Sequence, residues 1–159
     1  MKQVLSILVE NRCGELARIV ELFSARGHNI DSLTVSVTNN PEVAHITLVT
    51  NCEGSEIERL VKRIEAQVRV LCASNVTSGE YIKREFAIIR IKANGGELPA
   101  ECQALIAQNQ LKLLEASTDT FLLETTGDNE QVTKTINMLE RLGLREVVRV
   151  GPIAFPSSI

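Results

Sequence analysis

The sequence predicts an α+β fold made of two βαββαβ units, and three observations support this prediction. Apolar residues follow strand spacing and helix spacing in alternation along the chain. The same order of patterns occurs twice, with a period of roughly 80 residues. A polar, glycine-containing segment separates the two copies. We therefore expect a first domain at residues 1–77, a linker at 78–83 and a second domain at 84–159.

The first copy begins with a strand, because Leu5, Ile7 and Val9 alternate with other residues. A helix is expected to follow Gly14 and to end at Gly27. Its apolar face has the i, i+3, i+4, i+7 spacing and consists of Leu16, Ile19, Val20 and Phe23. The remaining elements are predicted as a strand at 30–38, a turn at 39–41, a strand at 43–50, a helix around 57–64 and a strand at 68–76.

The second copy repeats this order from Phe86 onward. Its elements are predicted as a strand at 86–93, a helix near 98–108, strands at 111–116 and 121–126, a helix at 131–142 and a strand at 146–153. Right-handed crossovers arrange each copy as a ferredoxin-like unit, an antiparallel sheet with two helices on one face. The strand at 30–38 then lies at a sheet edge. Pairing this edge with a second copy of the chain would cover it, so we expect a homodimer.

Composition excludes several classes of function. The chain has 159 residues, a net charge of −3, five aromatic residues (one Tyr, four Phe) and no clustered cations, which argues against binding to nucleic acid. No apolar run approaches the roughly 20 residues of a membrane span. The four cysteines form no C-x-x-C pair, so neither a metal site nor a redox motif is expected. We expect a cytoplasmic protein with reduced thiols.

The loop at residues 10–16 leads from the first strand directly into the first helix. Unpaired N–H groups and the positive end of the helix dipole make such a place suitable for a carboxylate. Gly14 would let a ligand approach the backbone, and Asn11 could hold either a carboxylate or an ammonium group. The alternative interpretation is that Gly14 is a turn glycine and Asn11 a loop cap.

Two segments together resemble a known family. The motif Asn11-x-x-Gly14-x-Leu16-x-Arg18, with residues 22–35, is similar to the ACT domain of acetohydroxyacid (acetolactate) synthase small subunits. The resemblance extends through residues 81–85 to about residue 93. It implies a non-catalytic chain that activates and feedback-regulates a large catalytic subunit in branched-chain amino acid biosynthesis. Thiamine diphosphate, FAD and magnesium would belong to that catalytic partner, with no cofactor or metal in this chain.

The resemblance also implies an effector site between two ACT domains, occupied by valine, leucine or isoleucine. The effector carboxylate would lie against the glycine loop of one subunit, and its ammonium group would reach the asparagine at the start of the second strand of the other. Carried over residue by residue, the site comprises Asn11, Gly14, Glu15 and Leu16 on one side, with Asn29 and Ile30 on the other.

Two questions stay open at this level. The segment at 108–112 lacks a Phe-Arg pair that the resemblance leads us to expect, so the second domain could engage the catalytic subunit differently or mainly pack. A free-standing sensor with two ACT domains, acting on transcription or on another enzyme, is the alternative function. An enzyme is disfavoured, because the chain has two histidines, His28 and His45, and no Gly-x-Ser-x-Gly or Walker segment.

Overall fold

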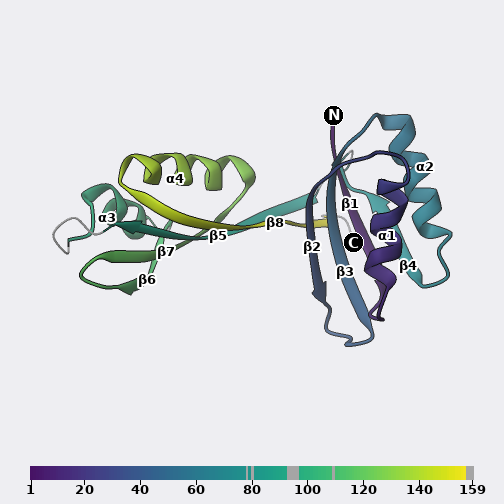
Figure 1. Cartoon of the computed structure of the whole chain (residues 1–159), viewed down its shortest axis with the longest axis horizontal. Coiled ribbons are helices and arrows are strands. Elements are labelled where there is room, and N and C mark those ends of the chain that lie inside the picture. The colour runs from purple at the N-terminus through teal and green to yellow at the C-terminus, as the bar shows by residue number, and fades with distance from the viewer. Residues whose placement is uncertain (78, 80, 93–96, 109, 157–159) are drawn as a thin grey trace. The chain divides into compact units, whose positions relative to one another are not determined.

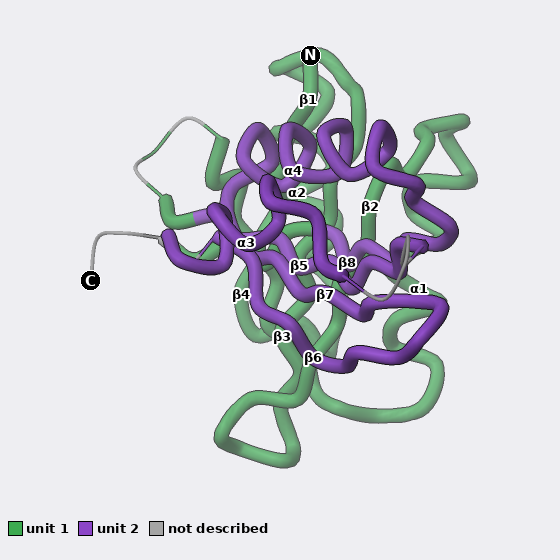
Figure 2. Tube along the Cα trace, turned by 90° about the vertical axis from the view of Figure 1, so that its left-hand side faces the viewer, with its two compact units in different colours: residues 1–82, 152–159 green, residues 83–151 purple. Residues whose placement is uncertain are grey.

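The chain folds into two compact units (Figure 2). The structure, a computed structural model, describes residues 1–77, 79, 81–92, 97–108 and 110–156. Unit 1 contains residues 1–82 and the C-terminal residues from 152 onward, and unit 2 contains residues 83–151. Positions 78 and 80 of the expected linker, position 93 of the expected strand at 86–93 and position 109 lie outside the described residues.

Unit 1 has the predicted βαββαβ order (Figure 1). Its elements are β1 (Lys2–Glu10), α1 (Glu15–Ser24), β2 (Ile30–Val37), β3 (Val43–Asn51), α2 (Gly54–Glu65) and β4 (Val70–Asn75). The strands are antiparallel in the order β2-β3-β1-β4. The strand at 30–38 is therefore at an edge of the sheet, as the crossover rules predict.

The core of unit 1 lies between one face of the sheet and the two helices. Leu5, Ile7 and Val9 of β1 are buried there, which confirms the alternation seen in the sequence. On α1, Ile19 and Phe23 complete the apolar face. Gly27 has a positive φ of 70° and lies where the chain leaves α1, a backbone conformation that glycine adopts at low cost.

Unit 2 repeats the same order, which confirms the predicted α+β class with two ferredoxin-like units. Its elements are β5 (Tyr81–Lys92), α3 (Ala100–Ala107), β6 (Lys112–Ala116), β7 (Thr120–Gly127), α4 (Asn129–Arg141) and β8 (Leu144–Pro156). The strand order β6-β7-β5-β8 matches that of unit 1 element by element. A reciprocal capping box between Asp128 and Gln131 begins α4. None of the described helices is long and apolar enough to span a membrane.

Two strands of unit 2 are longer than the sequence pattern indicates. β5 begins at Tyr81, so described residues at the end of the expected linker are strand, and β8 continues to Pro156. The end of β8 packs within unit 1, where Ala154 is fully buried against Val4, Val49 and Val76. The Ala154 N–H also donates to Oγ1 of Thr47 at 3.2 Å. Ala154 thus covers apolar side chains on the sheet face opposite the helices of unit 1.

Candidate functional site

The loop at residues 11–14 joins β1 to α1, and its conformation depends on Gly14. This glycine has φ 90° and ψ −13°, a left-handed conformation that is strained for other L-residues. No atom lies within 4 Å of the position where a Cβ would stand. The glycine is therefore required for its backbone angles, while the space in front of it is open to a ligand.

The N-terminus of α1 has unused hydrogen-bond donors. No side chain caps this helix end. Among the described residues, the backbone N–H groups of Cys13, Gly14 and Leu16 have no acceptor in the chain. Free N–H groups at the positive end of a helix dipole favour an anion such as a carboxylate. Leu16, 38% exposed in the same turn, supplies an apolar surface beside these donors.

Asn11 fixes the loop to the turn between β2 and β3. Its backbone N–H donates to the Glu42 carbonyl at 2.7 Å, and its Nδ2 donates to the Pro41 carbonyl at 2.9 Å. Arg12 adds ion pairs, at 3.2 Å to Glu10 and 3.6 Å to Glu42. Asn11 is predicted from the sequence to contact the effector, and its Nδ2 donor is used here to hold the loop in place.

Glu15, the first residue of α1, is buried directly after the loop. The residue is 3% exposed, and its Oε1 accepts hydrogen bonds from Arg18 at 2.7 Å and from Arg69 at 2.8 Å. Sequence reasoning missed Arg69, although a signal was present. Glu15 lies on the same face of α1 as Ile19 and Phe23, at the i, i+4, i+8 spacing. A carboxylate on this buried face requires a cationic partner.

Asn29 and Ile30 lie at the start of β2. Asn29 is exposed, and its Nδ2 donates to Oδ1 of Asp31 at 3.0 Å. Its carbonyl accepts a hydrogen bond from the Thr50 hydroxyl at 2.6 Å, which fixes the backbone at this point. Ile30 is half-buried against the core. The Asn29 side chain is therefore available at the surface, while the main chain beside it is held firmly.

Within one chain, the two predicted halves of the site are at opposite ends of the sheet. Ile30 is opposite Thr50, and Thr50 is opposite Gln3 near the start of β1. The loop at 11–14 follows Glu10, seven residues further along β1. At about 3.3 Å per residue the two halves are roughly 23 Å apart. A single chain does not bring them together.

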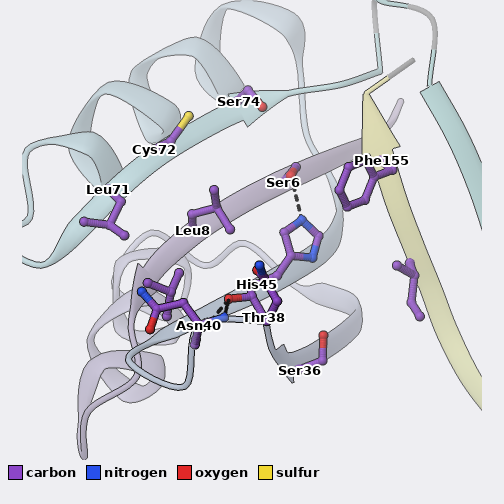
Figure 3. A pocket seen from close by; sticks show the side chains of 13 residues that line it. Ser6, Leu8, Ser36, Thr38, Asn40, His45, Leu71, Cys72, Ser74 and Phe155 are labelled. Carbon is purple, nitrogen blue, oxygen red and sulfur yellow. Dashed lines mark hydrogen bonds between the residues drawn. The ribbon is translucent and has the colours of Figure 1, made fainter. Parts of the chain in front are cut away.

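A separate groove lies on the sheet face of unit 1 that the helices leave uncovered (Figure 3). It has a volume of about 790 Å³, and none of its lining residues belongs to the predicted effector site. The Ser6 hydroxyl and Nε2 of His45 share a hydrogen bond of 2.9 Å. The ring centroid of His45 is 5.9 Å from that of Phe155. Burial lowers the pKa of His45 below its usual value of 6.5.

The described residues contain no cluster of three or more His, Cys, Asp or Glu that could hold a metal ion. All four cysteines are free, with Cys52 and Cys102 buried and Cys13 and Cys72 exposed. Burial raises the pKa of Cys102 to about 11, so this thiol is protonated at neutral pH.

Both units match described protein families. Residues 5–71 match the AHAS small subunit-like ACT domain, and residues 84–158 match the small subunit of acetolactate synthase. A probable acetolactate synthase small subunit from Archaeoglobus fulgidus is 32% identical, over 97% of this chain and 96% of that protein. The acetolactate synthase small subunit from Bacillus subtilis is 31% identical, over 98% of this chain and 90% of that protein.

A solved structure has the same fold over the whole chain. The crystal structure of the acetolactate synthase small subunit from Thermotoga maritima matches with a TM-score of 0.88 at 24% sequence identity. The match covers 100% of this chain and 99% of that one. The arrangement of two βαββαβ units is therefore shared with a known protein.

Proposed function

Because the chain belongs to the family of acetolactate synthase small subunits, we propose that it binds a branched-chain amino acid and thereby activates and feedback-regulates a large catalytic subunit. The effector is valine, leucine or isoleucine, and it binds between two copies of unit 1. Catalysis, with its thiamine diphosphate, FAD and magnesium, belongs to the large subunit in the cytoplasm. The observation that carries the proposal is the register of the unit 1 sheet.

This register supports a site shared by two chains, because pairing of the two β2 edges would bring the two predicted halves of the site together. Among the described residues, β2 has only β3 as a neighbouring strand. If two β2 edges pair antiparallel about a two-fold axis, Asn29 of one chain lies beside the Val37 end of the other. Val37 is opposite Ala44, and Ala44 is opposite Val9, at the end of the sheet that carries the loop at 11–14. Pairing therefore brings Asn29 toward the glycine loop of the partner.

The chemistry of the two halves fits an amino acid. The free N–H groups around Gly14 are donors for the effector carboxylate, and the side-chain oxygen of Asn29 is an acceptor for the ammonium group. Leu16 offers an apolar contact for a branched side chain. The exposed Val35 and Val37 on β2, 42% and 56% exposed, would be covered by the same pairing.

Calorimetry on the full chain with valine, leucine, isoleucine and glycine tests the effector. We expect at least one branched-chain amino acid to bind, with one effector per chain, and glycine not to bind. Sedimentation should show a dimer. A stable monomer that binds valine would contradict the two-chain site. Absence of binding for all three branched amino acids would contradict the effector proposal as a whole.

Co-purification with an acetolactate synthase catalytic subunit tests the partner. A free-standing amino-acid sensor would bind the effector without retaining that subunit. The match of residues 84–158 to the family supports the regulatory subunit over this alternative, because it extends beyond the ACT domain. Recovery of the catalytic subunit together with higher activity than that of the catalytic subunit alone is the expected result.

A further inference from the structure

Arg69 contacts both ends of the glycine loop. It lies in the segment between α2 and β4, immediately before Val70. Its backbone carbonyl accepts a hydrogen bond from the N–H of Glu10, the last residue of β1, at 2.9 Å. Its guanidinium Nη1 donates to Oε1 of Glu15, the first residue of α1, at 2.8 Å. Arg69 thus holds both Glu10 and Glu15, the residues on either side of the loop at 11–14.

The side chain of Arg69 also bridges two acidic groups. Its Nε is 3.8 Å from Oε2 of Glu10, while its Nη1 is bonded to Glu15. The Glu15 side chain is only 4% exposed, so its carboxylate depends on protein partners in place of water. Loss of Arg69 would leave this buried carboxylate with Arg18 as its one remaining charged partner among the described residues, and a weakly compensated buried charge favours movement of the loop toward solvent.

The two arginines that pair with Glu15 differ in what they can position. Arg18 is on α1 itself, three residues further along, so it moves with the helix. Arg69 belongs to a different segment, whose backbone is bonded to the end of β1. Of these two contacts, that of Arg69 fixes the helix N-terminus relative to the sheet. The directions of the free N–H groups at Cys13 and Gly14 depend on this relation.

We propose that Arg69 is a positioning residue of the effector site, acting through Glu15 to hold the N-terminus of α1 where its free N–H groups receive the effector carboxylate. This inference rests on the proposed function of the loop at 11–14. Arg69 need not touch the effector, because its contribution is the placement of donors that do. A displaced helix N-terminus would weaken binding even though every donor remained present.

The test compares Arg69→Gln with Arg69→Lys and with Arg59→Gln in the full-length chain. Arg59 is an exposed arginine on α2 outside this network, so its substitution controls for loss of one surface charge. We expect Arg69→Gln to raise the dissociation constant for valine by about tenfold or more, as for loss of a charge-assisted hydrogen bond. Arg59→Gln should bind like the wild type, and Arg69→Lys should recover part of the affinity.

A double variant tests whether Arg69 acts through Glu15. If it does, Glu15→Gln combined with Arg69→Gln should weaken valine binding no more than Arg69→Gln alone. Losses that simply add would overturn the proposal, as would an Arg69→Gln chain with wild-type affinity or an Arg69→Lys chain that binds no better than Arg69→Gln. If Arg69→Gln does not fold, the lysine variant and Glu15→Gln still decide the question. A wild-type chain that binds no branched amino acid refutes the proposed function itself.

Discussion

Units 1 and 2 share an architecture down to single hydrogen bonds but differ where a ligand would bind. In unit 1 the Thr50 hydroxyl donates to the Asn29 carbonyl just before β2, and in unit 2 the Thr125 hydroxyl donates to the Gln110 carbonyl just before β6. The two bonds are equivalent in the two sheets. Gln110 therefore occupies in unit 2 the place that Asn29 occupies in unit 1.

The units diverge at the N-terminus of their first helix. In unit 1 this end is a short loop that finishes at Gly14 in a left-handed conformation, with free N–H groups. In unit 2 the helix α3 follows Pro99, which has no backbone N–H, and the connection from β5 is longer. The βαββαβ fold therefore supplies a helix end, whereas the loop sequence determines whether that end can receive a carboxylate.

A charge placed at the N-terminus of α1 should cause the strongest loss of effector binding. Gly14→Asp adds a carboxylate where the effector carboxylate would lie, and like charges at about 4 Å repel by roughly 4 kcal/mol at an effective dielectric constant near 20. We expect valine binding to weaken by at least about a hundredfold. Ala100→Asp, at the start of α3, should leave binding unchanged. Calorimetry on both variants measures the contrast.

Gly14→Asn separates charge from backbone strain in that experiment. Asparagine and aspartate tolerate a positive φ similarly, so the two variants share a strain of about 1 kcal/mol. Because Gly14 has open space around its Cβ position, no steric clash adds to this cost. If Gly14→Asn weakens valine binding as much as Gly14→Asp does, the electrostatic argument is wrong. If the Gly14→Asp chain binds valine normally, the effector site lies elsewhere.

A second contrast concerns the sheet faces that the helices leave uncovered. In unit 1, Ala154 is 0% exposed, whereas Val148 on the part of β8 in unit 2 is 58% exposed. Ala154→Asp would bury a charge against Val4 and Val49, so we expect a loss of about 2–3 kcal/mol in the free energy of unfolding. Val148→Asp should change it by about 0.5 kcal/mol or less. Equal urea midpoints for the two variants would show that residues 152–156 do not stabilise unit 1.

The equivalence of Asn29 and Gln110 gives a smaller, matched contrast. Asn29→Ala should weaken valine binding by about tenfold, because it removes one hydrogen bond to a charged group. Gln110→Ala should leave valine binding unchanged. In both variants the threonine hydrogen bond survives, since its acceptor is a backbone carbonyl. A similar loss in both variants would mean that the two units contribute alike to the effector site.

The fold could be predicted from the sequence because its determinants are local and repeated. The spacing of Leu5, Ile7 and Val9, and of Ile19 with Phe23, specifies which face of each element is buried. The internal repeat then supplied the order of elements twice. Gly14 and Asn29 could be singled out from a sequence motif, and Gly14 has the positive φ that such a loop glycine suggests.

What the sequence did not reveal depends on contacts between distant positions. Arg69 is 54 residues from Glu15, and no periodic pattern relates them. The hydrogen bond from the Ala154 N–H to Oγ1 of Thr47 spans 107 residues, so the end of β8 could not be assigned to unit 1 from local alternation. The burial of Glu15 follows from its place on the helix face, and the expectation that it contacts the effector, which rests on its place in the motif, stays a prediction.

The smallest expected effect is a pH dependence confined to unit 1, because residues 83–151 contain no histidine. Burial lowers the pKa of His45 in the folded chain, so between that value and about 6.5 the unfolded chain binds a proton that the folded chain does not. Stability should therefore be unaffected above about pH 7.5 and should fall as the pH drops through 6.5, until the folded-state pKa is passed. His45→Gln retains a hydrogen-bonding group beside Ser6 but has no such titration. We expect urea midpoints of the wild type to fall more between pH 7.5 and 5.5 than those of His45→Gln. Parallel curves would show that titration of the half-buried His45 ring does not contribute to this pH dependence.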